Sequence, residues 1–240
     1  VKWYSYQNKP DKGFFQYLKS NNIYLNIIYS DSLKDEVKNQ YLAFLVIALL
    51  NGDEDINLTA EQSLIIHLIE SKNYALIAQF IFLFSNLAIS KQEIAGEKVN
   101  ILFPKILSEV HNELDAKLKV YSNLCYWAKF ITVLNVENTK WLSQIASVAE
   151  NFQSAPILLE AFVKLSEKYS NEVYEIWLAL LQNNQYDYSE QLIKGIFKNI
   201  ILKGHDGSRK SKKIAERYLH HGMRRPSDWL EQILKELENK

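Results

Sequence analysis

Basic side chains gather in one short stretch near the C-terminal end of the sequence. Between Lys203 and Arg225 the chain holds eight lysines and arginines against two acidic residues, although its 28 basic and 28 acidic side chains balance overall. All four arginines lie in this stretch. Because the planar guanidinium group grips phosphate or carboxylate better than an ammonium group does, this composition favours anion binding.

The spacing of these residues places them on one face of a predicted helix over 209–221. At about 100° per residue, the basic side chains fall within roughly 120° of arc, and Ile214, Ala215, Tyr218 and Leu219 occupy the opposite, packing side. We call the predicted polyanion site the basic stripe, and its members are Arg209, Lys210, Lys213, Arg217, His220, His221, Arg224 and Arg225.

Two local features strengthen the polyanion hypothesis. Cations such as Arg209 would stand in the first turn of this helix, where the helix dipole disfavours them, with only Asp206 nearby. The preceding Gly204-His205-Asp206-Gly207-Ser208 segment offers two glycines and a capping serine, so that free backbone amides could receive an anion. The alternative is a solvated helix face balanced by acidic neighbours or by another domain. Both interpretations stay open.

Other chemistry-bearing residues form no recognisable catalytic or metal motif. HExxH, GxSxG and phosphate-loop patterns are absent from the sequence, and a single cysteine, Cys125, excludes CxxC sites. His67 lies among aliphatic residues and is interpreted as a packed or boundary histidine. A charged group is interpreted as solvated, namely Glu109, His111, Glu113 and Asp115. We therefore expect no metal, no cofactor and no enzymatic activity.

Composition indicates a folded helical protein. The chain of 240 residues is 48% hydrophobic and 23% charged, with only seven glycines and four prolines to make turns. The single cysteine fits a reducing, cytoplasmic location. The longest apolar run, 41–50, is half a membrane span, so we expect no membrane association. A first residue of Val and a lone Met223 suggest a piece of a longer chain.

Capping residues and apolar spacing divide the sequence into about ten helices. Asn73 is a predicted N-cap, Thr59 with Gln62 forms a capping-box pattern, and Gly204 is a predicted helix stop. The segment 23–29 is interpreted as helix, although its β-branched and aromatic residues would also suit a strand. The predicted helices cover 33–50, 60–71, 74–90, 100–112, 115–134, 139–151, 154–167, 170–182, 187–203, 209–221 and 228–238.

Short connections between these helices require neighbours to pack antiparallel. The sequence therefore predicts an all-α fold of stacked antiparallel helix pairs, either an α-solenoid or a layered bundle. We expect one domain over 1–240, with an uncertain start at 1–30 and a basic helical subregion at 187–240. Two successive pairs, 139–167 and 171–203, are each about thirty residues long, which is within the range of helical repeats.

Trp177-Leu178 followed by Tyr186 resembles the aromatic pattern of tetratricopeptide repeats, and the pair spacing over about 100–240 is similar to that of tetratricopeptide or HEAT-type solenoids. This resemblance implies a domain that binds proteins or nucleic acids, often as the terminal arm of a large modular protein such as a bacterial signalling or defence NTPase. The leading hypothesis is a non-catalytic interaction domain that binds a protein partner or another part of its own chain. Nucleic-acid or polyanion binding through the basic stripe is the alternative.

Overall fold

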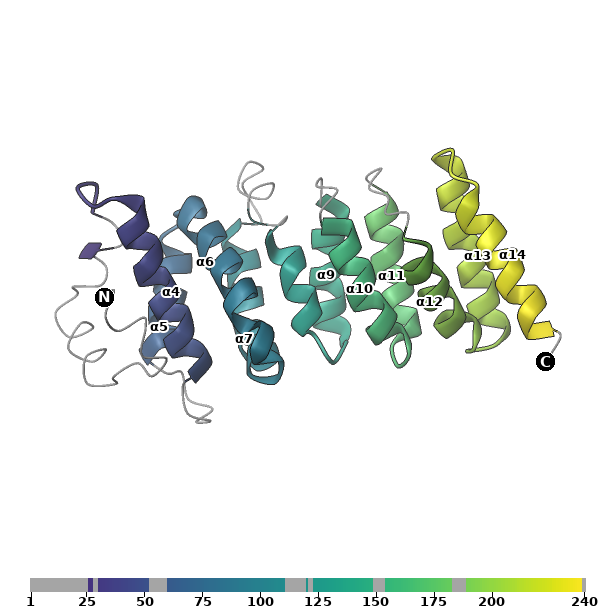
Figure 1. The fold of residues 1–240 in the computed structure, drawn as a ribbon, viewed down its shortest axis with the longest axis horizontal. Coiled ribbons are helices and arrows are strands. Elements are labelled where there is room, and N and C mark those ends of the chain that lie inside the picture. The colour runs from purple at the N-terminus through teal and green to yellow at the C-terminus, as the bar shows by residue number, and fades with distance from the viewer. Residues whose placement is uncertain are drawn as a thin grey trace. The chain divides into compact units, whose positions relative to one another are not determined.

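A computed structural model describes residues 26–27, 30–51, 60–110, 120, 123–148, 154–182 and 189–238, and all its secondary-structure elements are helices (Figure 1). This confirms the predicted all-α class, and ten α-helices have their bounds in the described ranges. Of the segment 23–29, only residues 26 and 27 are described, and both are helical. The chain divides into two compact units, Val1–Val120 and Tyr121–Lys240.

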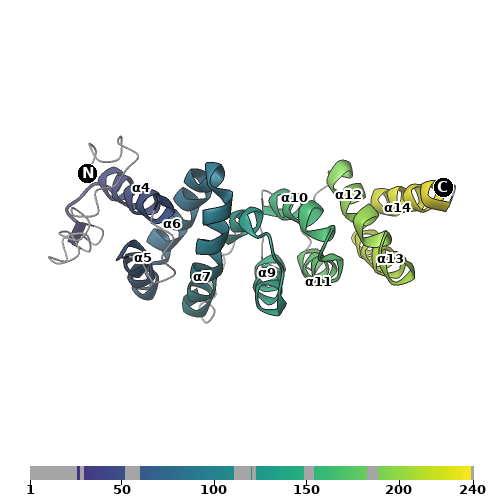
Figure 2. The same cartoon turned by 90° about the horizontal axis from the view of Figure 1, so that it is seen from below.

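The N-terminal unit contains two layers of helices. Its elements are α4 (Asp35–Asn51), α5 (Ala60–Glu70), α6 (Tyr74–Leu87), the short 3-10 helix η1 (Ala88–Ser90) and α7 (Gln92–Val110). Helix α4 packs beside α6, and α5 packs beside α7, as Figure 2 shows. Aromatic side chains such as Phe80 and Phe103 are fully buried between the layers. Burial of this apolar surface is the main term that holds the unit together.

The helix starts of this unit can be compared with the N-caps predicted from the sequence. The backbone amide of Leu76 donates to the Asn73 side chain at 3.3 Å, which confirms Asn73 as an N-cap. Thr59 lies outside the described residues. The side chain of its predicted capping-box partner, Gln62, is buried and accepts a hydrogen bond from Lys98 Nζ at 3.4 Å. Gln62 therefore links α5 to α7.

The predicted helix 100–112 is wrong at its start, because α7 begins at Gln92 and Pro104 lies inside it instead of in its first turn. Residues between 92 and 100 that looked like a polar connection include buried Ala95 and Val99. Their burial against the neighbouring helices outweighs the local polarity, so the helix extends backwards over them. Pro104 has no amide hydrogen, and the carbonyl of Asn100 therefore lacks its usual helical donor.

The C-terminal unit also has two layers. Its elements are η2 (Cys125–Phe130, a 3-10 helix), α9 (Val136–Val148), α10 (Ser154–Ser166), α11 (Ser170–Leu181), α12 (Glu190–Ile201), α13 (His205–His220) and α14 (Arg225–Glu238). Helices α9, α11 and α13 lie side by side in one layer, and η2, α10, α12 and α14 form the other (Figure 2). Successive helices thus alternate between layers.

The predicted long helix 115–134 is wrong in its second half. The described helical residues end at Phe130 as a 3-10 helix, and residues 131–135 form an irregular connection. Asn135 and Asn138 stabilise this connection because each side-chain oxygen accepts from the other's backbone amide, at 2.9 and 2.7 Å. Helix α9 therefore begins at Val136, and Asn138 completes its cap from within the first turn.

The core of the C-terminal unit centres on Trp177. Its fully buried ring lies 5.2 Å from that of Phe197 and 6.2 Å from that of Tyr218, in a near edge-on arrangement with the latter. These three residues come from α11, α12 and α13, so one aromatic cluster joins both layers. Aromatic pairs at such distances add to the free energy gained by burial alone.

Candidate binding face

Helix α13, which carries most of the basic stripe, begins four residues earlier than predicted. It starts at His205 after Gly204, whose φ of 88° ends α12 as the sequence indicated. The prediction that 204–208 is a loop with a capping serine is therefore wrong, because Gly207 and Ser208 lie inside the first turn and Ser208 N donates to the Gly204 carbonyl. Gly207 is buried against the Ile200 carbonyl, an approach that no side chain would permit.

The first turn of α13 contains Asp206 in place of the predicted cations, and the helix dipole favours a negative charge at this position. Its carboxylate lies 2.7 Å from Lys210 Nζ and 2.7 Å from Arg209 Nη2. Hydrogen bonds from Lys210 and then from Arg209 lower the Asp206 pKa to about 2. Arg209 and Lys210 of the basic stripe are therefore both paired with a carboxylate of the same chain.

Two stripe residues fasten α13 to α11. Lys210 Nζ donates to Asn171 Oδ1 at 2.6 Å, near the start of α11. His221 Nε2 lies 3.0 Å from the Leu181 carbonyl, at the end of α11, where helical carbonyls have no partner within their own helix. Lys210 and His221 thus fix the parallel orientation and the register of the two helices, which is a structural role that the sequence did not indicate.

The side chains of the remaining residues of the basic stripe are more exposed to solvent. Ile214, Ala215 and Tyr218 are buried as predicted, but Leu219 is 47% exposed, so its predicted place on the packing side is wrong. Arg224 lies 3.5 Å from Asp228 in the next helix, and Arg225 is exposed at the start of α14. Three exposed stripe residues of α13 have no ion pair within the described part of the chain, and we call them the open stripe: Lys213, Arg217 and His220.

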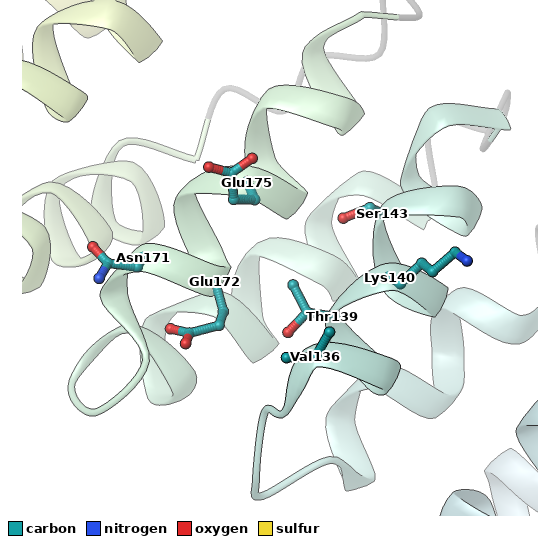
Figure 3. Close-up of a pocket in the computed structure, with 7 residues that line it drawn as sticks. All are labelled: Val136, Thr139, Lys140, Ser143, Asn171, Glu172 and Glu175. Atoms are coloured by element: carbon teal, nitrogen blue, oxygen red, sulfur yellow. The ribbon is translucent and has the colours of Figure 1, made fainter.

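A groove of about 460 Å³ lies in the same layer, between α9 and α11 (Figure 3). Helix α9 contributes one wall at helical spacing, and α11 contributes the other. The lining residues are Val136, Thr139, Lys140, Ser143, Asn171, Glu172 and Glu175. Sequence analysis missed this groove, since most of its lining residues are of polar types and its two walls lie about thirty-five residues apart in the chain.

Asn171 connects the groove to the basic stripe, because it lines the groove and also accepts the hydrogen bond from Lys210. The exposed surface of α9, α11 and α13 therefore carries the groove and the open stripe side by side. We call this surface the binding face. Lys140, Glu172 and Glu175 form no ion pair there with any described residue.

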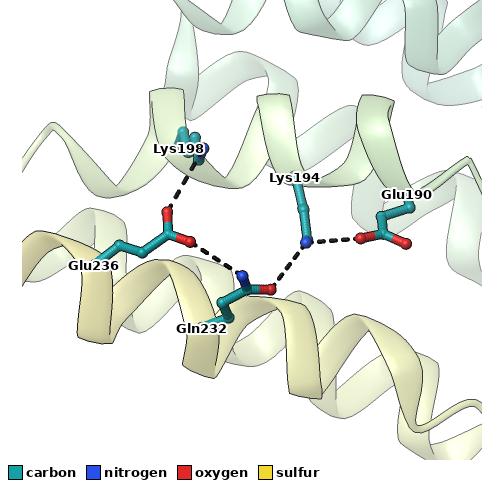
Figure 4. A network of polar contacts seen from close by, with 5 residues as sticks. All are labelled: Glu190, Lys194, Lys198, Gln232 and Glu236. Atoms are coloured by element: carbon teal, nitrogen blue, oxygen red, sulfur yellow. Dashed lines mark hydrogen bonds and ion pairs between the residues drawn. The ribbon is translucent and has the colours of Figure 1, made fainter.

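The other layer differs in its charges. On α12 and α14, Lys194 Nζ contacts Glu190 at 2.7 Å and Gln232 Oε1 at 2.9 Å. Gln232 donates to Glu236 at 3.1 Å, and Glu236 lies 3.8 Å from Lys198, which completes a continuous network (Figure 4). The charges of this network thus satisfy one another, whereas Lys140, Glu172 and Glu175 along the groove have no such partners among the described residues.

Metal ligation is not indicated among the described residues, where no three His, Cys, Asp or Glu side chains lie close enough to hold an ion. His67 is exposed on α5, 4.0 Å from Glu70, so the predicted packing of this histidine is wrong. Cys125 is buried. Three members of the predicted charged group, His111, Glu113 and Asp115, lie outside the described residues.

Comparison of the chain with protein-family models, curated proteins and solved structures finds no match. Within the described ranges, no helix has the length and hydropathy needed to cross a bilayer. Function must therefore be argued from the binding face itself.

Proposed function

We propose that this chain is a non-catalytic interaction domain of the α-solenoid type, which binds a protein partner or another segment of its own polypeptide on the binding face. The layered packing supports the solenoid assignment. In each unit a helix packs within its own layer beside the helix two places further along the chain, and most successive helices also contact each other across the layers. This is the arrangement of tetratricopeptide and HEAT-type repeats.

The groove between α9 and α11 carries the proposal. Its charged walls lack intramolecular ion pairs among the described residues, while the equivalent charges of α12 and α14 are paired with one another. Exposed charges along a groove are hydrated in the free protein, and a bound segment of complementary charge can pair with them. Helical repeats commonly use such a layer surface for binding.

Selection of random peptides displayed on phage against the 240-residue chain tests this proposal. Ser143 lies on the groove wall, so Ser143→Trp should fill the groove and reduce the affinity of selected peptides by at least tenfold. Lys164→Trp, on an exposed position of α10 in the other layer, is the matched control and should leave the affinity unchanged. Failure to enrich any peptide above background would refute the proposal.

Nucleic-acid binding through the open stripe is the second candidate. Lys213, Arg217 and His220 line one side of α13 without a described acidic partner, which favours contact with a polyanion. Because Arg209 and Lys210 both pair with Asp206, we count only the open stripe and expect about three phosphate contacts. A plot of log affinity against log salt would then have a slope of about −3. Absence of binding to DNA and RNA at low salt would exclude this candidate.

A further inference from the structure

We propose that the ligand of the binding face is an extended, zwitterionic peptide segment that crosses α11, with a basic side chain at Glu172 and Glu175 and an acidic side chain at Lys213 and Arg217. This inference rests on the proposed function and names the chemistry of its partner. It follows from the relative positions of the two sets of charges on neighbouring helices of one layer.

The two tethers between α11 and α13 define the register of these helices. Lys210 contacts Asn171, and His221 contacts Leu181, so eleven residues of one helix match ten of the other. The helices therefore run parallel, and Glu175 stands at nearly the same height as Lys213. A segment that crosses the helices at right angles meets the carboxylates first and the open stripe next.

Helix spacing sets the separation of the charges that the ligand must carry. Packed helices lie about 8–10 Å apart, and an extended chain advances about 3.3 Å per residue. A crossing segment should therefore place its basic and acidic side chains about two to three residues apart. The groove accepts the first part of the segment, and Asn171 lies at the point where the segment passes towards α13.

Electrostatics favours this ligand over a uniformly charged one. A polyanion that followed the open stripe into the groove would meet Glu172 and Glu175, and a polycation would meet Lys213 and Arg217. Like charges brought together in this way oppose binding, so the face selects for opposite charges in one segment. Within the described residues, neither set of charges is neutralised by an ion pair of its own.

The same phage-displayed library tests this inference by the sequences that it yields. Enriched peptides should carry Lys or Arg about two to three positions from Asp or Glu, in one order or the other. Glu172→Lys with Glu175→Lys should weaken such peptides about tenfold, as should Lys213→Glu with Arg217→Glu, because each change replaces two attractions by two repulsions. A peptide whose basic residue is changed to Glu should recover binding to the lysine variant.

Matched charge reversals on α10, Glu160→Lys and Lys164→Glu, are the controls and should change affinity less than twofold. A different result would overturn this inference and leave the proposed function standing: selected peptides that lose affinity for the Ser143→Trp variant but do not carry opposite charges. Selection of purely acidic peptides or of nucleic acid by the open stripe would also overturn it. A library that yields no binders would refute both.

Discussion

Trp177 Nε1 donates a hydrogen bond to the Tyr218 hydroxyl across 3.3 Å, between two side chains that are almost completely buried. The two residues belong to α11 and α13, parallel helices that are separated in the chain by the whole of α12. A buried indole needs a polar partner for its N–H group, and here that partner lies on the helix that carries the basic stripe. This contact makes the position of the stripe depend on the core.

Replacement of either residue should therefore destabilise the C-terminal unit by different amounts. Tyr218→Phe leaves the indole N–H without its acceptor and should lower the free energy of unfolding by about 1–3 kcal/mol. Trp177→Ala removes the ring itself and should cost about 3–5 kcal/mol. Urea unfolding followed by circular dichroism measures both, and equal effects of the two variants would contradict the assigned hydrogen bond and burial.

Gly207 and Gly195 form a matched pair, since both stand inside helices. At Gly207 a Cβ atom would overlap the Ile200 carbonyl oxygen, so Gly207→Ala should force α13 away from α12 and cost about 2–3 kcal/mol. At Gly195 a Cβ would make an ordinary contact with Val163 at 3.5 Å, so Gly195→Ala should gain up to about 1 kcal/mol in helix propensity. Thermal unfolding compares them, and a tolerated Gly207→Ala would show that α12 and α13 do not approach as described.

The Ser211 hydroxyl is buried without a hydrogen-bond partner among the described residues. Ser211→Ala removes this unsatisfied group from the middle of α13 and should raise the free energy of unfolding by about 1 kcal/mol. Buried Ser166 is the control, because it accepts a hydrogen bond from Asn199 at 2.9 Å, and Ser166→Ala should instead destabilise. A loss of stability in Ser211→Ala would indicate a hydrogen bond that the structure lacks.

Asp206 should make the free energy of unfolding of the C-terminal unit depend on pH in the acidic range. Its folded-state pKa of about 2 lies below the ordinary value of 3.8, so the unfolded chain binds the proton more readily. The contribution of Asp206 is therefore complete above about pH 4 and lost as the pH falls towards 2. The difference in melting temperature between wild type and Asp206→Asn should shrink over this range, and also in concentrated salt. A difference that is constant with pH would refute the ion pairs with Arg209 and Lys210.

Much of the fold was predictable because its signals are local. Asn73 and Gly204 mark helix boundaries by their own chemistry, and the helix predicted over 187–203 corresponds to α12, whose buried residues include Ile193 and Phe197. Errors arose where packing opposed local composition. The stretch before Asn100 reads as polar but is buried on one side, and β-branched residues after Phe130 favour extended backbone over helix.

The candidate site was less predictable because its partners are distant in the chain. The one-helix projection placed Lys213 and Arg217 on an exposed face, where they are found. It gave the same assignment to Lys210 and His221, whose partners on α11 lie 39 and 40 residues away. No periodicity in one helix reveals such contacts, and the groove likewise exists only once α9 and α11 are adjacent.

The double tether between α11 and α13 has a dynamic consequence. A helix end normally frays by breaking its last few hydrogen bonds, but the end of α11 cannot open without releasing His221, and the beginning of α11, at Asn171, cannot open without releasing Lys210. The two helices therefore share their local opening events, and the terminal amides of both should exchange with deuterium at a common rate. A ligand seated on α11 alone would then slow exchange in α13 as well.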